Sequence, residues 1–133
     1  MIEEEVLLRV PAATRGERDI VFGWTGEHTD EPYMFVAYAQ SPGYECYPVI
    51  NIWRNDLARC VPYLTKLYLA ACKGYPLDTK QPFIVRDSGK RELFRIAMTR
   101  DAVIFQSSTK KFRISTLYLQ FVLKFFESIV QND

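Results

Sequence analysis

The feature that most constrains the fold is a pattern, present twice, in which a short strand runs directly into a helix. It is clearest over residues 110–129, KKFRISTLYLQFVLKFFESI, where alternating polar and apolar residues give way to helical apolar spacing. A looser version occupies residues 47–67, YPVINIWRNDLARCVPYLTKL. An offset of 62 residues aligns Ile52 with Ile114, Leu57 with Leu119, Cys60 with Val122, Val61 with Leu123 and Leu64 with Phe126. This spacing predicts a duplicated unit, although strands followed by helices can also align by coincidence.

The sequence predicts four strands before each helix. In the first half the expected strands cover residues 5–10, 19–24, 33–40 and 47–53. Asn55 or Asp56 is expected to cap a helix that runs to about residue 73, with Gly74 as its stop. In the second half the expected strands cover residues 81–87, 91–98, 102–108 and 110–115. Ser115 or Thr116 is expected to cap the last helix, which extends to about residue 131.

The predicted fold class is therefore α+β, with two ββββα halves that form one domain over residues 1–133. The halves cover residues 1–74 and 75–133. Each half alone is too small to bury a good core, so we expect the two to pool their sheets and helices. Pro62 is expected either to kink the first helix or to start its main part.

The last predicted helix is apolar around most of its circumference. Its polar positions, Gln120, Lys124, Glu127 and Gln131, form one narrow stripe. A helix of this kind must be buried on more than one side. It is expected to pack centrally in the monomer or to form a dimer interface, and we predict a homodimer through this helix.

Charge is distributed unevenly between the halves. Residues 1–74 carry 7 Lys and Arg against 10 Asp and Glu, whereas residues 75–133 carry 10 against 6. The basic excess is concentrated between Arg86 and Arg113, where 8 basic residues accompany 3 acidic ones. This is a modest electrostatic footprint confined to the second half.

The chain holds few of the residues that catalytic and metal sites need. Its single histidine, His28, lies in GEHTDEP, where a solvated acidic loop is a simpler interpretation than a weak cation site. Cys46, Cys60 and Cys72 have no metal-type spacing and are expected to be reduced thiols. The sequence contains neither a phosphate-binding glycine motif nor a membrane-spanning run. Its acidic start MIEEE differs from the basic and apolar regions of a signal peptide, so none is expected. We expect a non-enzymatic protein without cofactor, metal or membrane partner, in the cytoplasm, or in the nucleoid or nucleus if it binds nucleic acid.

Strand alternation in the second half gathers cations on one face of the predicted sheet. The residues expected to face the helix are Phe94, Ile96, Met98, Phe112 and Ile114. The residues expected on the opposite face are Arg91, Arg95, Lys111 and Arg113. Arg and Lys pair with phosphates, so this face predicts contacts with a nucleic-acid backbone. The plain alternative is the solvated face of an antiparallel sheet.

An aromatic ring beside these cations would complete a single-strand site, because unstacked bases lie on rings. On the strand between the cations, either Val103 and Phe105 or Ile104 and Gln106 share the outer face. We predict binding of single-stranded DNA or RNA, with Phe105 or Trp53 as the stacking ring.

The first half supports a different hypothesis. It is acidic and rich in Tyr and Trp, and its outer sheet face is expected to show Tyr47, Asn51 and Trp53. Aromatic residues anchor many protein interfaces. The alternative function is therefore a protein-interaction factor, such as an inhibitor, immunity or assembly protein, that binds its partner through this half.

Residues 91–129, RELFRIAMTRDAVIFQSSTKKFRISTLYLQFVLKFFESI, resemble a PUR repeat, the ββββα module of Pur-alpha-like single-stranded nucleic-acid binders. The resemblance rests on strand lengths, tight turns and a terminal amphipathic helix, and Whirly proteins and single-strand-binding coactivators have similar units. It implies two intertwined repeats in one domain, further dimerisation and binding of single strands. The first half departs from this pattern in its acidity, its insert TGEHTDEPY and Pro62. The Lys-Gly-rich segment that marks Whirly proteins is absent from the sequence.

Overall fold

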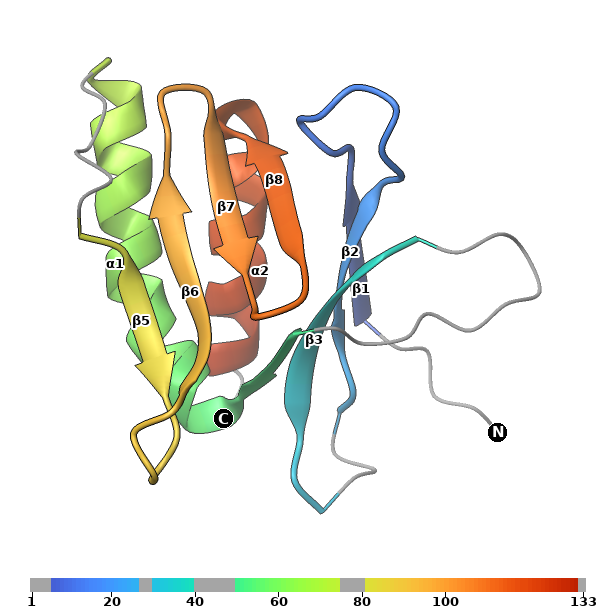
Figure 1. The fold of residues 1–133 in the computed structure, drawn as a ribbon, viewed down its shortest axis with the longest axis vertical. Helices are drawn as coiled ribbons and strands as arrows, with labels where there is room; N and C mark the ends of the chain where they lie inside the picture. The colour runs from blue at the N-terminus through green and yellow to red at the C-terminus, as the bar shows by residue number, and fades with distance from the viewer. Residues whose placement is uncertain (1–5, 27–29, 40–49, 75–80, 132–133) are drawn as a thin grey trace.

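The computed structural model describes residues 6–26, 30–39, 50–74 and 81–131 (Figure 1). The elements of the first half are β1 (Val6–Val10), β2 (Ile20–Trp24), β3 (Tyr33–Tyr38), β4 (Ile50–Trp53) and α1 (Arg54–Cys72). Those of the second half are β5 (Phe83–Arg86), β6 (Glu92–Met98), β7 (Ala102–Gln106), β8 (Lys111–Ser115), the 3₁₀ turn η1 (Thr116–Tyr118) and α2 (Leu119–Gln131). Every predicted strand and both predicted helices are present, and within the described residues their ends differ by a few residues. Residues 5, 40 and 47–49 of the predicted strands, Tyr47 among them, lie outside the described residues.

The eight strands form two antiparallel sheets of four strands. The first sheet has the order β1-β2-β3-β4, and the second sheet has the order β5-β6-β7-β8. The last strand of each sheet leads directly into a helix, β4 into α1 and β8 through η1 into α2. The predicted α+β class with two ββββα halves is confirmed.

The two strand-to-helix joints differ in how the helix begins. α1 begins at Arg54, immediately after β4, without a side-chain capping hydrogen bond. The predicted caps Asn55 and Asp56 are wrong because no residue separates strand from helix, which places both inside the first helical turn. At the second joint the Ser115 hydroxyl accepts a hydrogen bond from the Leu117 N–H at 3.3 Å, so Ser115 caps the 3₁₀ turn η1 that leads into α2.

Pro62 lies inside α1, which continues from Arg54 to Cys72, so Pro62 does not start the helix. Because proline has no N–H, the carbonyl of Ala58, four residues earlier, receives no helical hydrogen bond from Pro62. Ala58 is exposed, so water can reach this carbonyl. The helix stops as predicted at Gly74, where φ is 73° and the N–H donates to the Ala71 carbonyl at 3.1 Å.

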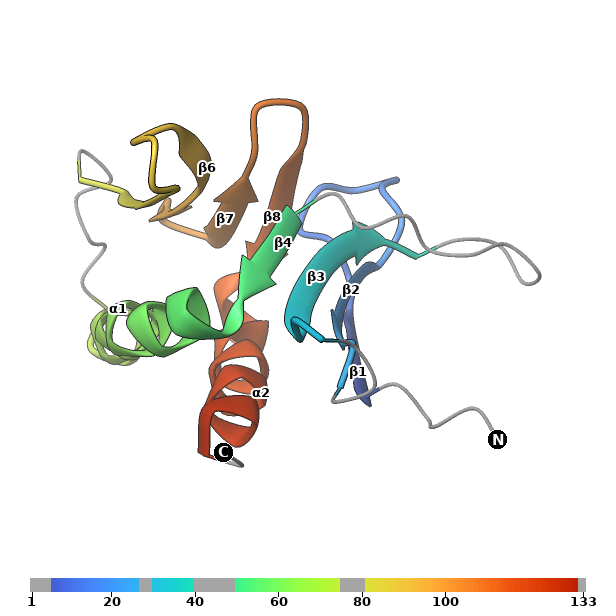
Figure 2. The same ribbon diagram turned by 90° about the horizontal axis from the view of Figure 1, so that it is seen from below.

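Both helices lie on the inner side of the second sheet (Figure 1). α1 comes from the first half but lies beneath β5, where the Tyr63 and Phe83 rings stack with centroids 5.2 Å apart. α2 lies between the sheets (Figure 2). There the Phe126 ring is 6.1 Å from Phe22 of the first sheet and 6.2 Å from Phe105 of the second. Each helix therefore connects the two halves.

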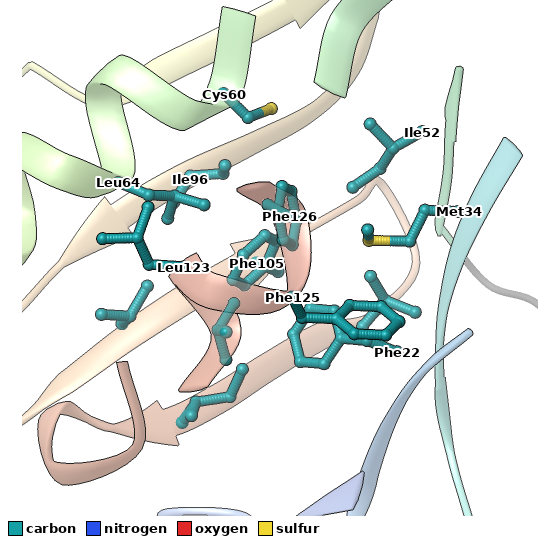
Figure 3. Packing of buried hydrophobic residues seen from close by; sticks show 14 of the residues in the cluster. Phe22, Met34, Ile52, Cys60, Leu64, Ile96, Phe105, Leu123, Phe125 and Phe126 are labelled. Carbon is teal, nitrogen blue, oxygen red and sulfur yellow. The ribbon is translucent and has the colours of Figure 1, made fainter. Parts of the chain in front are cut away.

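One hydrophobic cluster draws on both halves (Figure 3). The offset of 62 residues runs through it, since Ile50, Ile52, Leu57, Cys60, Leu64 and Leu67 correspond to Phe112, Ile114, Leu119, Val122, Phe126 and Ile129, and every member is buried. The predicted pair Val61 and Leu123 matches less well, because Val61 is only half-buried. The same core spacing therefore serves the last strand and the helix of each half.

Most of the apolar circumference of α2 is buried within one chain. Its buried residues are Leu119, Val122, Leu123, Phe125, Phe126 and Ile129. The large apolar side chains left exposed near this helix are Leu117, at 78%, and Phe121, at 46%. The observed position is the central one of the two that the sequence allowed, and a homodimer through α2 stays a prediction.

The two sheets also meet at the outer edge of β8. The Ala13 N–H donates to the Arg113 carbonyl at 2.8 Å, and the Tyr38 hydroxyl donates to the Lys111 carbonyl at 3.0 Å. The Tyr38 ring also packs on Phe112, with centroids 4.7 Å apart. These contacts satisfy part of an edge that would otherwise offer unpaired backbone groups.

Candidate nucleic-acid interface

The register of the second sheet places its outward side chains in two neighbouring rows. One row across β5 to β8 consists of Ile84, Arg95, Gln106 and Lys111, and the next, across β6 to β8, consists of Ala97, Ile104 and Arg113. The opposite face carries the buried residues Phe94, Ile96, Met98, Phe112 and Ile114, as the alternation predicts. Neighbouring strands lie about 4.8 Å apart, so the backbones at Arg95 and Lys111 are about 10 Å apart.

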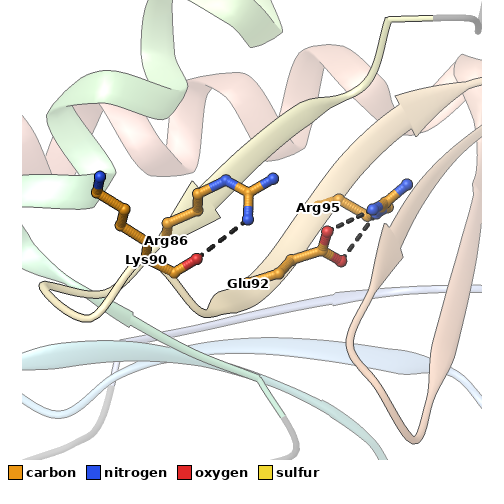
Figure 4. Close-up of polar contacts among 4 residues, drawn as sticks. All are labelled: Arg86, Lys90, Glu92 and Arg95. Atoms are coloured by element: carbon orange, nitrogen blue, oxygen red, sulfur yellow. Dashed lines mark hydrogen bonds and ion pairs between the residues drawn. The ribbon is translucent and has the colours of Figure 1, made fainter.

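Arg95 is the central cation of this face and forms an ion pair. Its Nε donates to Glu92 Oε2 at 2.9 Å, and a second guanidinium nitrogen contacts Glu92 Oε1 (Figure 4). The hydrogen bond from Arg95 holds the pKa of Glu92 below its usual value, so Glu92 is charged at neutral pH. A phosphate at Arg95 would therefore have to compete with a carboxylate already in place.

Arg91 lies outside the two rows. It occupies the exposed turn between β5 and β6, where its N–H donates to Asp87 Oδ1 at 2.9 Å. In the same turn the Arg86 guanidinium donates to the Lys90 carbonyl at 3.1 Å (Figure 4). Arg91 therefore extends the basic surface at the end of the hairpin rather than its centre.

Lys111 and Arg113 lie on the same strand and point to the same side. They are two residues apart, which separates their backbones by about 6.8 Å. The Lys111 side chain is exposed and that of Arg113 is half-buried. The structure thus brings Arg95, Lys111 and Arg113 together on one face, with Arg91 at its margin.

Phe105 does not lie on this face, and its predicted role as a stacking ring is wrong. The residue is 0% exposed, and its ring contacts Phe22 edge-on at 5.3 Å. The alternation of β7 turns Val103 and Phe105 into the core, which leaves Ile104 and Gln106 facing outward. The second of the two alternatives for this strand is the observed one.

Trp53 lies on the first sheet and therefore does not share a face with these cations. It is 37% exposed, and its ring meets that of its cross-strand partner Tyr33 at 5.0 Å. The same outer face carries a second apolar cluster formed by Val21, Phe35, Ala37 and Ala39. The outer face of the first sheet thus carries an aromatic pair and a buried apolar cluster, together with the exposed Asn51 and the Arg9–Asp19 ion pair.

An open hollow of about 570 Å³ lies where the two halves meet. Its lining residues are Gly16, Glu17, Arg18, Tyr38, Thr109, Lys110 and Lys111. Of these, only Lys111 was predicted as a site residue. Arg18, Tyr38 and Lys110 come from segments far apart in the chain, and no sequence pattern links them.

The described residues do not gather the groups that a metal site needs. Within them, no three or more His, Cys, Asp and Glu side chains lie close enough to hold an ion. Burial raises the pKa of the Cys60 thiol to about 12, so it is protonated at neutral pH. His28 and Cys46 lie outside the described residues. In the described ranges, no helix has the length and apolarity needed to cross a membrane.

Comparison of the chain with protein-family models, curated proteins and solved structures finds no match. The resemblance to PUR and Whirly repeats stays a prediction. The candidate interface therefore rests on strand register, burial and charge.

Proposed function

We propose that the protein binds single-stranded DNA or RNA, without catalysis, through the outer face of the second sheet. The observation that carries this proposal is the register that sets Arg95, Lys111 and Arg113 around Gln106 on one face. Cationic side chains of this kind contact phosphates, and a glutamine amide can hydrogen-bond the edge of an unpaired base.

The shape of the face favours a single strand over a duplex. A four-stranded sheet measures about 14 Å between its outer strands, whereas the major groove of duplex DNA is about 12 Å wide. The sheet therefore cannot enter the groove to read bases. A single strand is flexible enough to follow the rows of side chains across the sheet.

Phosphate contacts rather than base stacking would supply the affinity. In the described part of the second sheet, the outward positions of the strands hold no aromatic side chain. Binding carried by phosphates depends little on base sequence and weakens steeply as salt rises. Trp53 could stack a base only if the strand also reached the first sheet.

Fluorescence anisotropy with a labelled 15-nucleotide single strand and the matching duplex tests the proposal. We expect tighter binding of the single strand, and a slope of log K against log salt near −2, about −0.7 for each of three phosphate contacts. Absence of binding at about 50 μM protein in low salt, where the phosphate term is strongest, would contradict the proposal.

A protein partner is the second candidate, and the outer face of the first sheet favours it. Trp53 is 37% exposed and its ring contacts the half-buried Tyr33, and exposed aromatic rings of this kind anchor many interfaces. The neighbouring cluster around Phe35 is buried and supports the pair from below. An apolar interface of this kind should be nearly insensitive to salt, which separates it from phosphate binding.

A further inference from the structure

The hollow between the halves presents cations that the rows of the second sheet do not include. Its lining contains three cationic residues, Arg18, Lys110 and Lys111, and one carboxylate, that of Glu17. Arg18 belongs to the loop between β1 and β2, whereas Lys110 and Lys111 belong to the turn before β8 and to its first residue. The first half contributes one cation and one carboxylate, so Lys110 and Lys111 supply the surplus of positive charge, and the docking of the halves brings Arg18 beside them.

Hydrogen bonds hold the turn that presents Lys110. The Ser107 hydroxyl accepts hydrogen bonds from the Thr109 N–H at 3.3 Å and from the Lys110 N–H at 3.2 Å. The Ser107 N–H in turn donates to the Lys110 carbonyl at 2.9 Å. The backbone at Lys110 is thus fixed before any ligand arrives, which reduces the ordering entropy on binding.

Tyr38 links the two sides of the hollow. Its hydroxyl lies 3.1 Å from Glu17 Oε2 and 3.0 Å from the Lys111 carbonyl, and it can donate to either acceptor. Burial, followed by the nearby Glu17 carboxylate, raises the pKa of Tyr38, so the hydroxyl remains a donor at neutral pH. The hydroxyl has one proton to share between the two acceptors, and when it donates to Glu17 a neutral group engages the carboxylate of the hollow.

We propose that this hollow binds a phosphate group, jointly held by Lys110 and Lys111 of the second half and Arg18 of the first. The inference rests on the proposed function, because Lys111 belongs both to the hollow and to the row of cations on the second sheet. A strand lying on the sheet would pass one phosphate into the hollow. The volume falls within the range of small-molecule sites, so the group could equally come from a free polyphosphate.

Two matched pairs of variants test the hollow with a 15-nucleotide single strand. Glu17→Gln removes the carboxylate of the hollow and should tighten binding of the strand roughly two- to fivefold. Its control is Glu31→Gln, just before the end of β3 far from Tyr38, which should leave the affinity unchanged. Lys110→Gln should weaken binding and reduce the salt slope by about 0.7, while Lys124→Gln on α2 should not change the slope. If each variant behaves like its control while the strand still binds, the inference is overturned and the proposed function stands.

A second measurement does not depend on nucleic acid. Titration with tripolyphosphate, followed by ¹H–¹⁵N NMR, should shift the amide signals of residues 16–18 and 109–111 before those elsewhere. Shifts at these amides without any oligonucleotide binding would assign the hollow to free polyphosphate and contradict the proposed function. The inference is also overturned if tripolyphosphate leaves these amides unmoved.

Discussion

The two sheets share a strand order and a following helix, yet their outer faces differ in chemistry. The second sheet presents Arg95, Lys111 and Arg113, whereas the first presents Trp53 and Tyr33 above a buried apolar cluster around Phe35. Their inner faces contribute to one cluster with the same spacing over the last strand and helix. Core positions are constrained because interiors are close-packed, whereas an outer face is constrained mainly by what contacts it. The outer faces can therefore differ in chemistry while the core spacing of the two halves stays the same.

The largest expected effect concerns the hydrophobic core that the two sheets share. Phe126→Ala removes a ring that contacts both Phe22 and Phe105, and should destabilise the fold by about 3–5 kcal/mol. Both tryptophans, Trp24 and Trp53, lie in the first half, so their fluorescence reports on that half alone. If the halves share one core, Phe126→Ala should lower the urea midpoint measured by tryptophan fluorescence and the midpoint measured by far-UV circular dichroism by the same amount.

Leu64→Ala is the matched variant, because Leu64 occupies the corresponding position in α1. It should destabilise by about 2–5 kcal/mol and also move both transitions. If Phe126→Ala leaves the urea midpoint of the tryptophan fluorescence unchanged and makes the circular dichroism transition biphasic, the halves unfold independently.

A smaller effect is expected from the outer face of the first sheet. The Phe35 ring lies across its cross-strand partner Gly23, where a Cβ atom would come within 2.2 Å of the ring. Gly23→Ala should therefore displace the ring and destabilise by about 1–3 kcal/mol, measured by urea unfolding. In a Phe35→Leu background the same change should have less effect, and equal losses in both backgrounds would mean that the ring is not what excludes the side chain.

The smallest expected effect concerns the ion pair on the second sheet. Glu92→Gln removes the carboxylate that engages Arg95, so the affinity for a single strand should rise roughly twofold. Anisotropy at low salt would measure the change. Unchanged or weaker binding would mean that Arg95 takes no part in binding the strand.

The same pair sets the direction of a pH effect. Because Arg95 lowers the pKa of Glu92 in the folded chain, the pair contributes stability above the ordinary value of 4.5, and this contribution is lost as pH falls below that value. Between pH 5.5 and 8 the pair should persist. Protonation of Glu92 should therefore not raise the affinity for a single strand between pH 5.5 and 8. A rise in affinity over this range that Glu92→Gln abolishes would contradict the lowered pKa of Glu92.

Much of the fold could be predicted from the sequence because periodicity records which side of an element is buried. Ile114 and Leu119 follow the offset from Ile52 and Leu57, and all four are buried. The crossing of α1 beneath β5 could not be predicted, since the Tyr63 and Phe83 contact depends on how the halves dock. The start of α1 was also missed, because Asn55 suggests a cap whether or not a strand precedes it directly.

The candidate site was predictable only in part. Alternation placed Arg95, Lys111 and Arg113 correctly on one face, because each belongs to a regular strand. It could not choose between Phe105 and Gln106 on β7, since both faces of that strand carry apolar residues and most of the strand is buried. The hollow could not be predicted from the sequence because it forms only where the two halves meet.

We propose that the outer face of the second sheet, and not positive charge in general, binds a nucleic-acid strand. Anisotropy across a salt series should compare two double variants with the same net charge, Lys111→Gln with Arg113→Gln, and Lys66→Gln with Lys124→Gln on the helices. The first double variant should weaken binding and flatten the salt slope by about 1.4, while the second should retain the slope of the unaltered protein. Equal slopes for the two double variants would contradict this proposal.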